Sequence, residues 1–162
     1  MKRSALAFAL CMSAAASTSA FAAAPEITYL QNAFDGRAKC LGAGDTVGMA
    51  ACDKSAAQQW VLERGAQPGY FRVHTVAGGD AACLMLDPDK PKDLVSMATC
   101  SDAASQQWGI ERSATAPYNM QFTNRATGKT RCLESIATGL KITSCERKAR
   151  GHLWAAQWSP TM

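Results

Sequence analysis

The sequence predicts an all-β domain built from three pseudo-equivalent units, and three observations lead to that prediction. One pattern occurs three times: a Cys-Leu pair, a second cysteine 12 to 17 residues later, and then a tryptophan. Short strand-like runs and Gly- or Pro-containing turns recur at the spacing typical of strand proteins. No segment after residue 24 has sustained helical periodicity. In a protein with such an internal repeat, each unit is expected to bury its apolar face against the other units.

The N-terminus has the pattern of a secretory signal peptide. Two cations precede an uncharged apolar run at residues 5–16, and small and polar residues follow. This order is typical of a leader that is cleaved on export, whereas a membrane anchor needs about 20 apolar residues. Lipoprotein processing at Cys11 is disfavoured by the bulky leucine before it. We expect cleavage after about Ala22, with residues 1–22 as the signal peptide and residues 23–162 as a single domain.

The mature chain has a small positive charge and an even number of cysteines. Without the leader, the net charge of +4 falls to +2 and seven cysteines become six. The charge is too small to indicate a nucleic-acid partner. Six cysteines in an exported protein indicate a disulfide framework, in a secreted or periplasmic location. The repeat selects one pairing within each unit: Cys40–Cys52, Cys83–Cys100 and Cys132–Cys145. None of these pairs has the close spacing of zinc ligands, so no metal is expected.

Each unit is expected to hold about four short strands. The run Trp60–Arg64 in the first unit corresponds to Trp108–Arg112 in the second. Each run is followed by a Pro-containing turn and a further strand-like run. Residues 26–30 take the same place ahead of the first unit. A Gly-containing turn precedes the first cysteine of every unit. The units are expected at about residues 25–66, 67–114 and 115–162.

The number of units decides between two all-β repeat architectures. A propeller typically needs four or more blades. Three units fit a β-trefoil instead, in which six strands form a barrel and six strands cap it.

A Gln-x-Trp triplet closes the first two units, as Gln58-Gln59-Trp60 and Gln106-Gln107-Trp108, whereas Ala156-Gln157-Trp158 keeps only the tryptophan. With the Cys-Leu openings, these triplets resemble the ricin B-type lectin trefoils over essentially the whole mature chain. The resemblance implies a carbohydrate-binding function and structural roles for five motif residues. These are three core tryptophans and two turn glutamines: Trp60, Trp108, Trp158, Gln58 and Gln106.

The resemblance also indicates where sugar contacts would lie, and the sequence departs from the family there. Family members commonly have an Asp two residues after the first cysteine, an aromatic platform two before the second, and a polar residue four before the second. The equivalents here are Gly42, Met85 and Glu134; Ala50, Ala98 and Thr143; and Gly48, Ser96 and Lys141. Only Glu134 keeps a carboxylate, so we expect any site to be concentrated in the third unit. The predicted carbohydrate-binding residues are Glu134, Lys141, Trp154, Gln157, Asp87, Ser96 and Gln106.

The third unit has a further irregularity. Five more residues separate Cys145 from Trp158 than separate the equivalent pairs in the other units, and they bring Arg147, Lys148, Arg150 and Trp154. Cations beside an aromatic residue suit an acidic glycan, a lipid head group or a partner protein. The alternative is a plain solvated loop whose Trp154 tucks under the barrel rim. Trp154 is the candidate for a substitute platform.

Nothing in the sequence indicates catalysis. Neither His74 nor His152 lies in a recognisable nucleophile or metal pattern, and no phosphate loop is present. We therefore expect no enzyme activity and no cofactor. Two functions remain. The first is an exported lectin-like module that recognises a glycan or glycoconjugate. The second is a protein-interaction or cell-binding subunit of a multi-subunit bacterial toxin or secreted complex, because bacterial genotoxins contain ricin-like trefoil subunits with eroded sugar sites.

Overall fold

The structure, a computed structural model, describes residues 27–87, 94–113, 119–146 and 148–158. The predicted signal peptide and its cleavage site lie outside the described residues, as does most of the Pro-rich loop that follows Asp87.

Six strands pair antiparallel in a closed ring, which forms the barrel. Around the ring, β1 pairs with β4, β4 with β5, β5 with β8, β8 with β9, β9 with β12, and β12 with β1. A closed ring leaves no open edge in the barrel. The barrel strands are β1 (Ile27–Asn32), β4 (Trp60–Arg64), β5 (Tyr70–Thr75), β8 (Trp108–Arg112), β9 (Met120–Asn124) and β12 (Trp154–Trp158).

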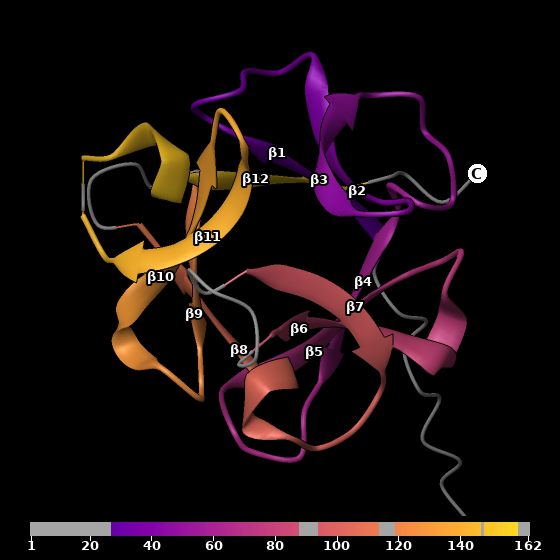
Figure 1. The fold of residues 1–162 in the computed structure, drawn as a ribbon, viewed down its shortest axis with the longest axis vertical. Coiled ribbons are helices and arrows are strands. Elements are labelled where there is room, and N and C mark those ends of the chain that lie inside the picture. Colours follow the sequence, from indigo (N-terminus) through magenta and orange to yellow (C-terminus); the bar gives the residue numbers. More distant parts are fainter. Residues whose placement is uncertain (1–26, 88–93, 114–118, 147, 159–162) are drawn as a thin grey trace, which may run out of the picture.

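Three hairpins cap one end of the barrel and form three lobes about a central axis (Figure 1). Short 3₁₀ helices lie at Gly79–Ala81, Ala104–Gln106 and Arg150–His152. This arrangement confirms the predicted all-β trefoil with three pseudo-repeats. The hairpins are β2 (Lys39–Ala43) with β3 (Val47–Ala51), β6 (Ala82–Leu86) with β7 (Val95–Thr99), and β10 (Gly128–Ile136) with β11 (Gly139–Ser144).

One disulfide closes each hairpin unit, which confirms the predicted pairing. The bridges join Cys40 to Cys52, Cys83 to Cys100, and Cys132 to Cys145, over sequence separations of 12, 17 and 13. Each bridge of this length contributes about 3 kcal/mol in the chain-entropy model.

Three fully buried tryptophans join the barrel to the hairpins. The indole Nε1–H of Trp60 donates to the carbonyl of Leu41 at 2.8 Å, and Trp108 donates to Leu84 at 2.8 Å. In the third unit the equivalent bond comes from Trp154, which donates to the carbonyl of the leucine after Cys132 at 3.0 Å. The structure therefore places Trp154, and not Trp158, in the third core position, which corrects the assignment made from the sequence.

The register of β12 supports this correction. β12 begins at Trp154, just as β4 and β8 begin at their tryptophans. Measured from the second cysteine, Trp154 lies nine residues on, against eight in the other two units. The third unit thus carries one extra residue before its tryptophan, and the five-residue excess expected from Trp158 is wrong. The side chain of Trp158 is outside the described part of the structure.

The residue two positions before each tryptophan holds the turn. In the first unit, Gln58 Oε1 accepts from the Asp53 N–H at 3.0 Å, and its Nε2 donates to the Ala51 carbonyl at 2.8 Å. Gln106 makes the same two bonds in the second unit, at 2.6 and 2.8 Å. These side chains satisfy backbone groups that would otherwise be unpaired near the core.

In the third unit a histidine takes the place of the glutamine. His152 Nδ1 accepts from the N–H of Glu146, the residue after Cys145, at 3.1 Å. Its Nε2 lies 2.7 Å from the Thr143 hydroxyl. His152 is buried, with 2% of its surface exposed. An imidazole has one acceptor and one donor nitrogen, so it can supply the acceptor that glutamine supplies in the other units.

Two asparagines tie neighbouring units together. Asn32 Nδ2, at the end of β1, donates to the Gly151 carbonyl in the third unit at 2.8 Å. Asn124 Nδ2, at the end of β9, donates to the Ser105 carbonyl in the second unit at 2.9 Å. Both asparagine side chains are buried, so each hydrogen bond is sheltered from water. Each bond links a barrel strand to the turn of the unit that precedes it around the threefold axis.

Replacing Trp154 with phenylalanine should destabilise the protein as much as the same change at Trp60 or Trp108. Each change leaves a buried leucine carbonyl unpaired and a cavity beside it, at a cost of about 2–4 kcal/mol in the free energy of unfolding. Denaturant unfolding of the three variants measures this. The variant Trp158→Phe should cost less, since it leaves the core hydrogen bond in place. A larger loss from W158F than from W154F would contradict the assignment.

Replacing His152 with glutamine should preserve the third turn, because glutamine supplies the acceptor that the other two units use. His152→Ala should lower the free energy of unfolding by about 1–3 kcal/mol, because the Glu146 amide loses its partner. Thermal unfolding compares the two variants. Equal destabilisation by glutamine and alanine would show that the hydrogen bond is not what holds the turn.

Candidate functional site

The hairpin register brings the family's sugar-contact positions face to face. The residue two after the first cysteine pairs across the hairpin with the residue four before the second. These cross-strand pairs are Gly42–Gly48, Met85–Ser96 and Glu134–Lys141. Directly opposed side chains in an antiparallel pair are close enough to interact. Only the third pair carries charges of opposite sign.

Glu134 is held from three sides. Its Oε2 accepts a hydrogen bond from the Thr143 hydroxyl at 2.9 Å and lies 3.4 Å from Lys141 Nζ. His152 Nε2 lies 3.8 Å from the same oxygen. The side chains of Glu134 and Lys141 are 21% and 35% exposed. The carboxylate is therefore sheltered and oriented, yet still open to solvent.

A directional chain of hydrogen bonds fixes this carboxylate. Nδ1 of His152 lies 3.1 Å from the Glu146 N–H, which can only donate, and 3.3 Å from the Glu146 carbonyl. The shorter contact assigns the acceptor role to Nδ1 and the ring proton to Nε2. Nε2–H then donates to Thr143 Oγ1, and the Thr143 hydroxyl donates to Glu134. Hydrogen bonds in such a chain polarise one another. The turn and the carboxylate are thus coupled through two side chains.

Gly151 lets the turn lie against Glu134. A Cβ at this position would come within 2.8 Å of Glu134 Cγ and 2.5 Å of the Ser135 carbonyl. The first two units carry Ala57 and Ser105 at the position before their turn glutamines, where Gly151 precedes His152. The close approach to the Ser135 carbonyl and to Glu134 therefore favours glycine at this position.

The equivalent region of the first unit is filled differently. A Cβ at Gly42 would lie 3.3 Å from Gln58 Cγ, so the turn glutamine packs directly over the glycine. At the start of the same turn, hydrogen bonds from Ser55 hold the pKa of the exposed Asp53 below its ordinary value. The Asp53 carboxylate therefore stabilises this turn by accepting hydrogen bonds from Ser55.

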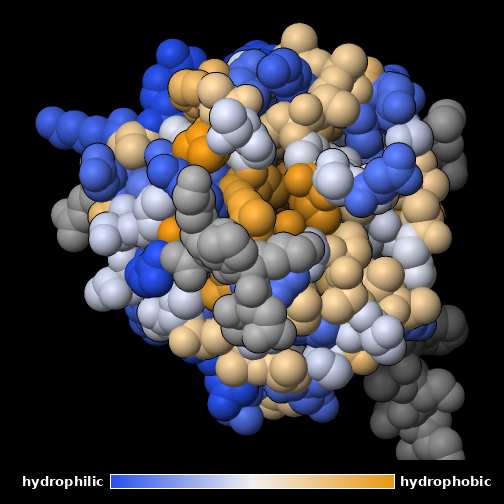
Figure 2. All heavy atoms as spheres, viewed as in Figure 1, coloured by the Kyte–Doolittle hydropathy of each residue, from blue (hydrophilic) through white to orange (hydrophobic). Residues whose placement is uncertain are grey.

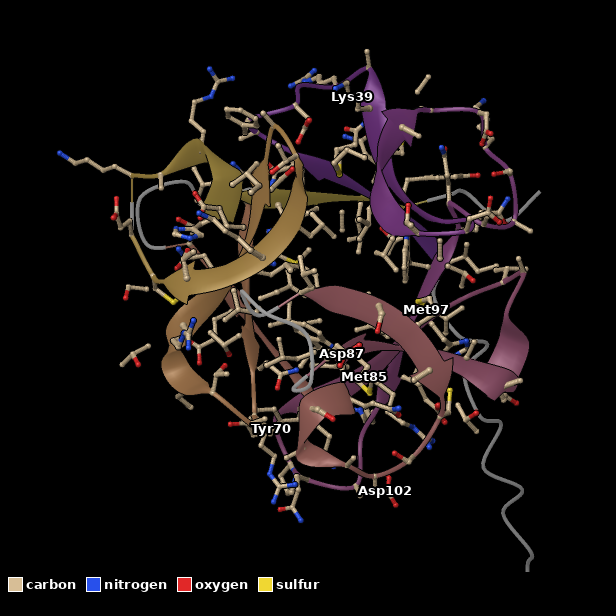
Figure 3. All side chains as sticks on the ribbon, in the orientation of Figure 1. Lys39, Tyr70, Met85, Asp87, Met97 and Asp102 are labelled. Atoms are coloured by element: carbon tan, nitrogen blue, oxygen red, sulfur yellow. A yellow bond between two sulfur atoms is a disulfide. The ribbon has the colours of Figure 1, made fainter. Side chains whose placement is uncertain are left out.

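The structure separates most of the predicted site residues. Glu134 and Lys141 come together, whereas Trp154 is fully buried in the core and presents no face to a ligand, which makes the platform prediction wrong. Gln106 is buried, and its side chain bonds within its own turn. The others lie elsewhere: Gln157 on the barrel wall, Ser96 on β7, and Asp87 just after β6. Figure 3 shows Asp87 near Met85 on the second unit.

The prediction from the sequence did not include the supporting role of His152, although the position of this residue in the chain indicates it. His152 stands two residues before Trp154, as Gln58 stands two before Trp60. Aligning the units on Trp154 would have identified it. Thr143 occupies the position of the family's aromatic platform and instead supplies the hydroxyl that links His152 to Glu134.

An apolar hollow lies where the three hairpins meet (Figure 2). It has a volume of about 610 Å³, and its polar rim includes Asp35 and Lys39. Its apolar lining includes Val47, Met49, Leu94, Val95, Met97 and Leu140.

Among the described residues, no group of three or more His, Cys, Asp or Glu side chains is placed to hold a metal ion. None of the helices there has the length and apolar character needed to cross a membrane.

Solved structures share this fold. A mosquitocidal holotoxin superposes with a TM-score of 0.71 at 12% identity, over 86% of this chain and 18% of its own. A Polyporus squamosus lectin bound to a human-type influenza-binding epitope gives 0.69 at 12% identity, over 83% of this chain and 49% of its own. The Macrolepiota procera ricin B-like lectin in complex with lactose gives 0.64 at 11% identity, over 85% of this chain and 98% of its own. At these identities the likeness shows the fold alone.

A comparison with curated protein sequences gives no match. The family model of the ricin-type β-trefoil lectin domain matches residues 26–154, which run from just before β1 to Trp154. The match thus ends on the third core tryptophan. Since it covers most of the chain, the protein belongs to the family of ricin-type β-trefoil lectin domains.

Proposed function

We propose that the chain is an exported, non-catalytic carbohydrate-binding module whose sugar site lies on the third hairpin. One observation carries the proposal: Glu134 and Lys141 oppose each other there, 3.4 Å apart and partly exposed. The same pair of positions is Gly42–Gly48 in the first unit and Met85–Ser96 in the second.

The chemistry of this pair suits sugar hydroxyls. A carboxylate accepts hydrogen bonds through several lone pairs, and an ammonium group donates up to three. Oε2 of Glu134 already holds Thr143 and Lys141, which leaves Oε1 for a ligand hydroxyl. Because Thr143 and His152 fix the carboxylate beforehand, binding orders few further side chains.

Affinity for a single sugar should be low. The position of the aromatic platform is taken by Thr143, so the third hairpin offers no stacking surface there. Binding to a multivalent glycan surface would compensate through effective concentration.

The same contacts support recognition without hydrolysis. Glycoside hydrolysis commonly uses a pair of carboxyl groups that flank the scissile bond. In the described part of the chain the Glu134 carboxylate contacts Lys141, Thr143 and His152, and none of these three side chains is a second carboxyl group.

A second candidate function is a protein-interaction or cell-binding subunit of a secreted complex. It is favoured by the lack of a carboxylate at Gly42 and Met85, the positions equivalent to Glu134 in the first two units, and by the apolar hollow between the hairpins. In that case the trefoil serves as a scaffold.

Glu134→Gln should weaken glycan binding by at least about tenfold, because a neutral amide replaces a charge-assisted acceptor at nearly the same volume. A glycan array on the mature protein, followed by calorimetry on the best ligand, measures the change. Glu63→Gln is the matched control, since Glu63 on β4 forms an exposed ion pair with Arg72 on β5 at 3.0 Å, outside the third hairpin. Equal losses in the two variants would reject the site, and no saturable binding by the unaltered chain would favour the second function.

Protein recovered from the periplasm or medium of a Gram-negative expression host should lack about the first 22 residues and contain three disulfides. The fold contains three disulfides, and disulfides form and persist in oxidising compartments such as the periplasm. Intact-mass spectrometry before and after reduction tests both points. A retained leader or free thiols in the folded protein would contradict export.

A further inference from the structure

A second pocket opens on the outer wall of the barrel and has a different chemistry. Its volume is about 610 Å³, within the range of small-molecule sites. It lies over β1 and β12, next to the end of β8 and the start of β9. Neither Glu134 nor the side chains that hold it line this pocket.

Three arginines from separate parts of the chain line the pocket. Arg37 lies in the loop after β1, Arg112 ends β8, and Arg150 begins the third 3₁₀ helix. All three are exposed. Of the third-unit cations named in the sequence analysis, Arg150 lines this pocket and Lys148 does not, whereas Arg147 lies outside the described residues.

The positive charge of the pocket is not neutralised by its surroundings. The described lining contains no Asp or Glu, and within the described part of the chain neither Arg37 nor Arg112 forms an ion pair. Arg150 is anchored, because its Nη2 donates to the Ala33 carbonyl at 2.6 Å, and its other N–H groups remain available. Like charges gathered without a counter-charge repel one another, and a bound anion removes that cost.

The remaining lining suits a sugar ring. Gln31, Asn119 and Gln157 are amides, which both donate to and accept from hydroxyl groups. Gln31 also donates to the Arg37 carbonyl at 2.8 Å, which holds the loop that carries this arginine. Met120 and two alanines of β12 provide an apolar surface.

We propose that this pocket binds acidic saccharides, with the guanidinium groups on a carboxylate or sulfate and the amides on neighbouring hydroxyls. Guanidinium groups pair with such anions through two parallel hydrogen bonds. The saccharide part rests on the proposed carbohydrate-binding function, but the site is separate from Glu134. The module would then recognise neutral and acidic parts of a glycan at two places.

The experiment compares matched ligands by NMR titration of the mature chain. The acidic ligands are 3′-sialyllactose, a glucuronate-terminated disaccharide and 6-sulfated N-acetylglucosamine; lactose and N-acetylglucosamine are their neutral counterparts. At least one acidic ligand should give saturable shifts at Arg37, Arg112 and Gln157, where its neutral counterpart gives none. The double variant R37Q/R112Q should weaken that binding by about tenfold or more, and rising salt should weaken it in the unaltered chain.

Arg64→Gln is the matched control. Arg64 ends β4 as Arg112 ends β8, is likewise exposed, and does not line the pocket. It should leave the affinity within about twofold, because it removes the same charge from an equivalent strand end outside the pocket. An equal loss from R64Q and the double variant would overturn the proposal, since general surface charge would then explain binding. So would the absence of pocket shifts with every acidic ligand.

Two further arms separate the sources of an anionic signal. Sodium sulfate that binds as tightly as the sulfated sugar would overturn the saccharide part, as would a polyglutamate peptide that binds more tightly than any acidic saccharide. Glu134→Gln separates this proposal from the proposed function. Acidic binding that survives in E134Q supports an independent pocket, whereas acidic binding lost in E134Q and kept in R37Q/R112Q would overturn it and leave the third-hairpin site standing.

Discussion

The hydrogen bond from each core indole to a leucine carbonyl is the interaction on which the rest of this structure depends. It joins the first residue of a barrel strand to the first strand of the adjacent hairpin, and it occurs in all three units. Each indole is fully buried, so the bond is made in a medium where an unpaired carbonyl would be costly. Through it, the position of every hairpin relative to the barrel is set.

The turn before each tryptophan follows from the same constraint. Once the indole is seated, the chain that leads back to the second cysteine must satisfy its amide groups in a short space. Gln58 and Gln106 do so with one amide side chain each, and His152 does so with a ring whose second nitrogen remains free to bond elsewhere. That second nitrogen reaches Thr143 and, through it, Glu134. The side chain that holds the turn of the third unit therefore also orients the charged group on its hairpin.

Much of the fold was predictable because its determinants recur locally. Each cysteine pair lies within one unit, and Cys-Leu marks the same strand three times. The pair Glu134 and Lys141 could also be predicted, since a hairpin register places them opposite each other. Trp158 was misassigned because Ala156-Gln157-Trp158 was taken as a third triplet that keeps only the tryptophan. The physical requirement is an acceptor two residues before the buried indole, and a histidine meets it as well as a glutamine.

The arginine pocket could not be predicted for a different reason. Arg37, Arg112 and Arg150 share no motif, and only the closing of the barrel brings these parts of the chain together. A local sequence pattern does not indicate which residues from distant parts of the chain come together in the fold. The same holds for Asn32, whose partner Gly151 lies 119 residues away.

The pairing of β1 with β12 has a consequence for how the molecule is assembled. Thr28 pairs with Trp158, so the ring joins the two ends of the described chain. Each disulfide, by contrast, spans 17 residues or fewer and can form as soon as its own unit is available. Closing a short loop costs less entropy than joining distant segments. Oxidation can thus proceed unit by unit along the emerging polypeptide, while the barrel stays open until its final strand arrives, and a chain interrupted before that strand would be cross-linked but unsealed.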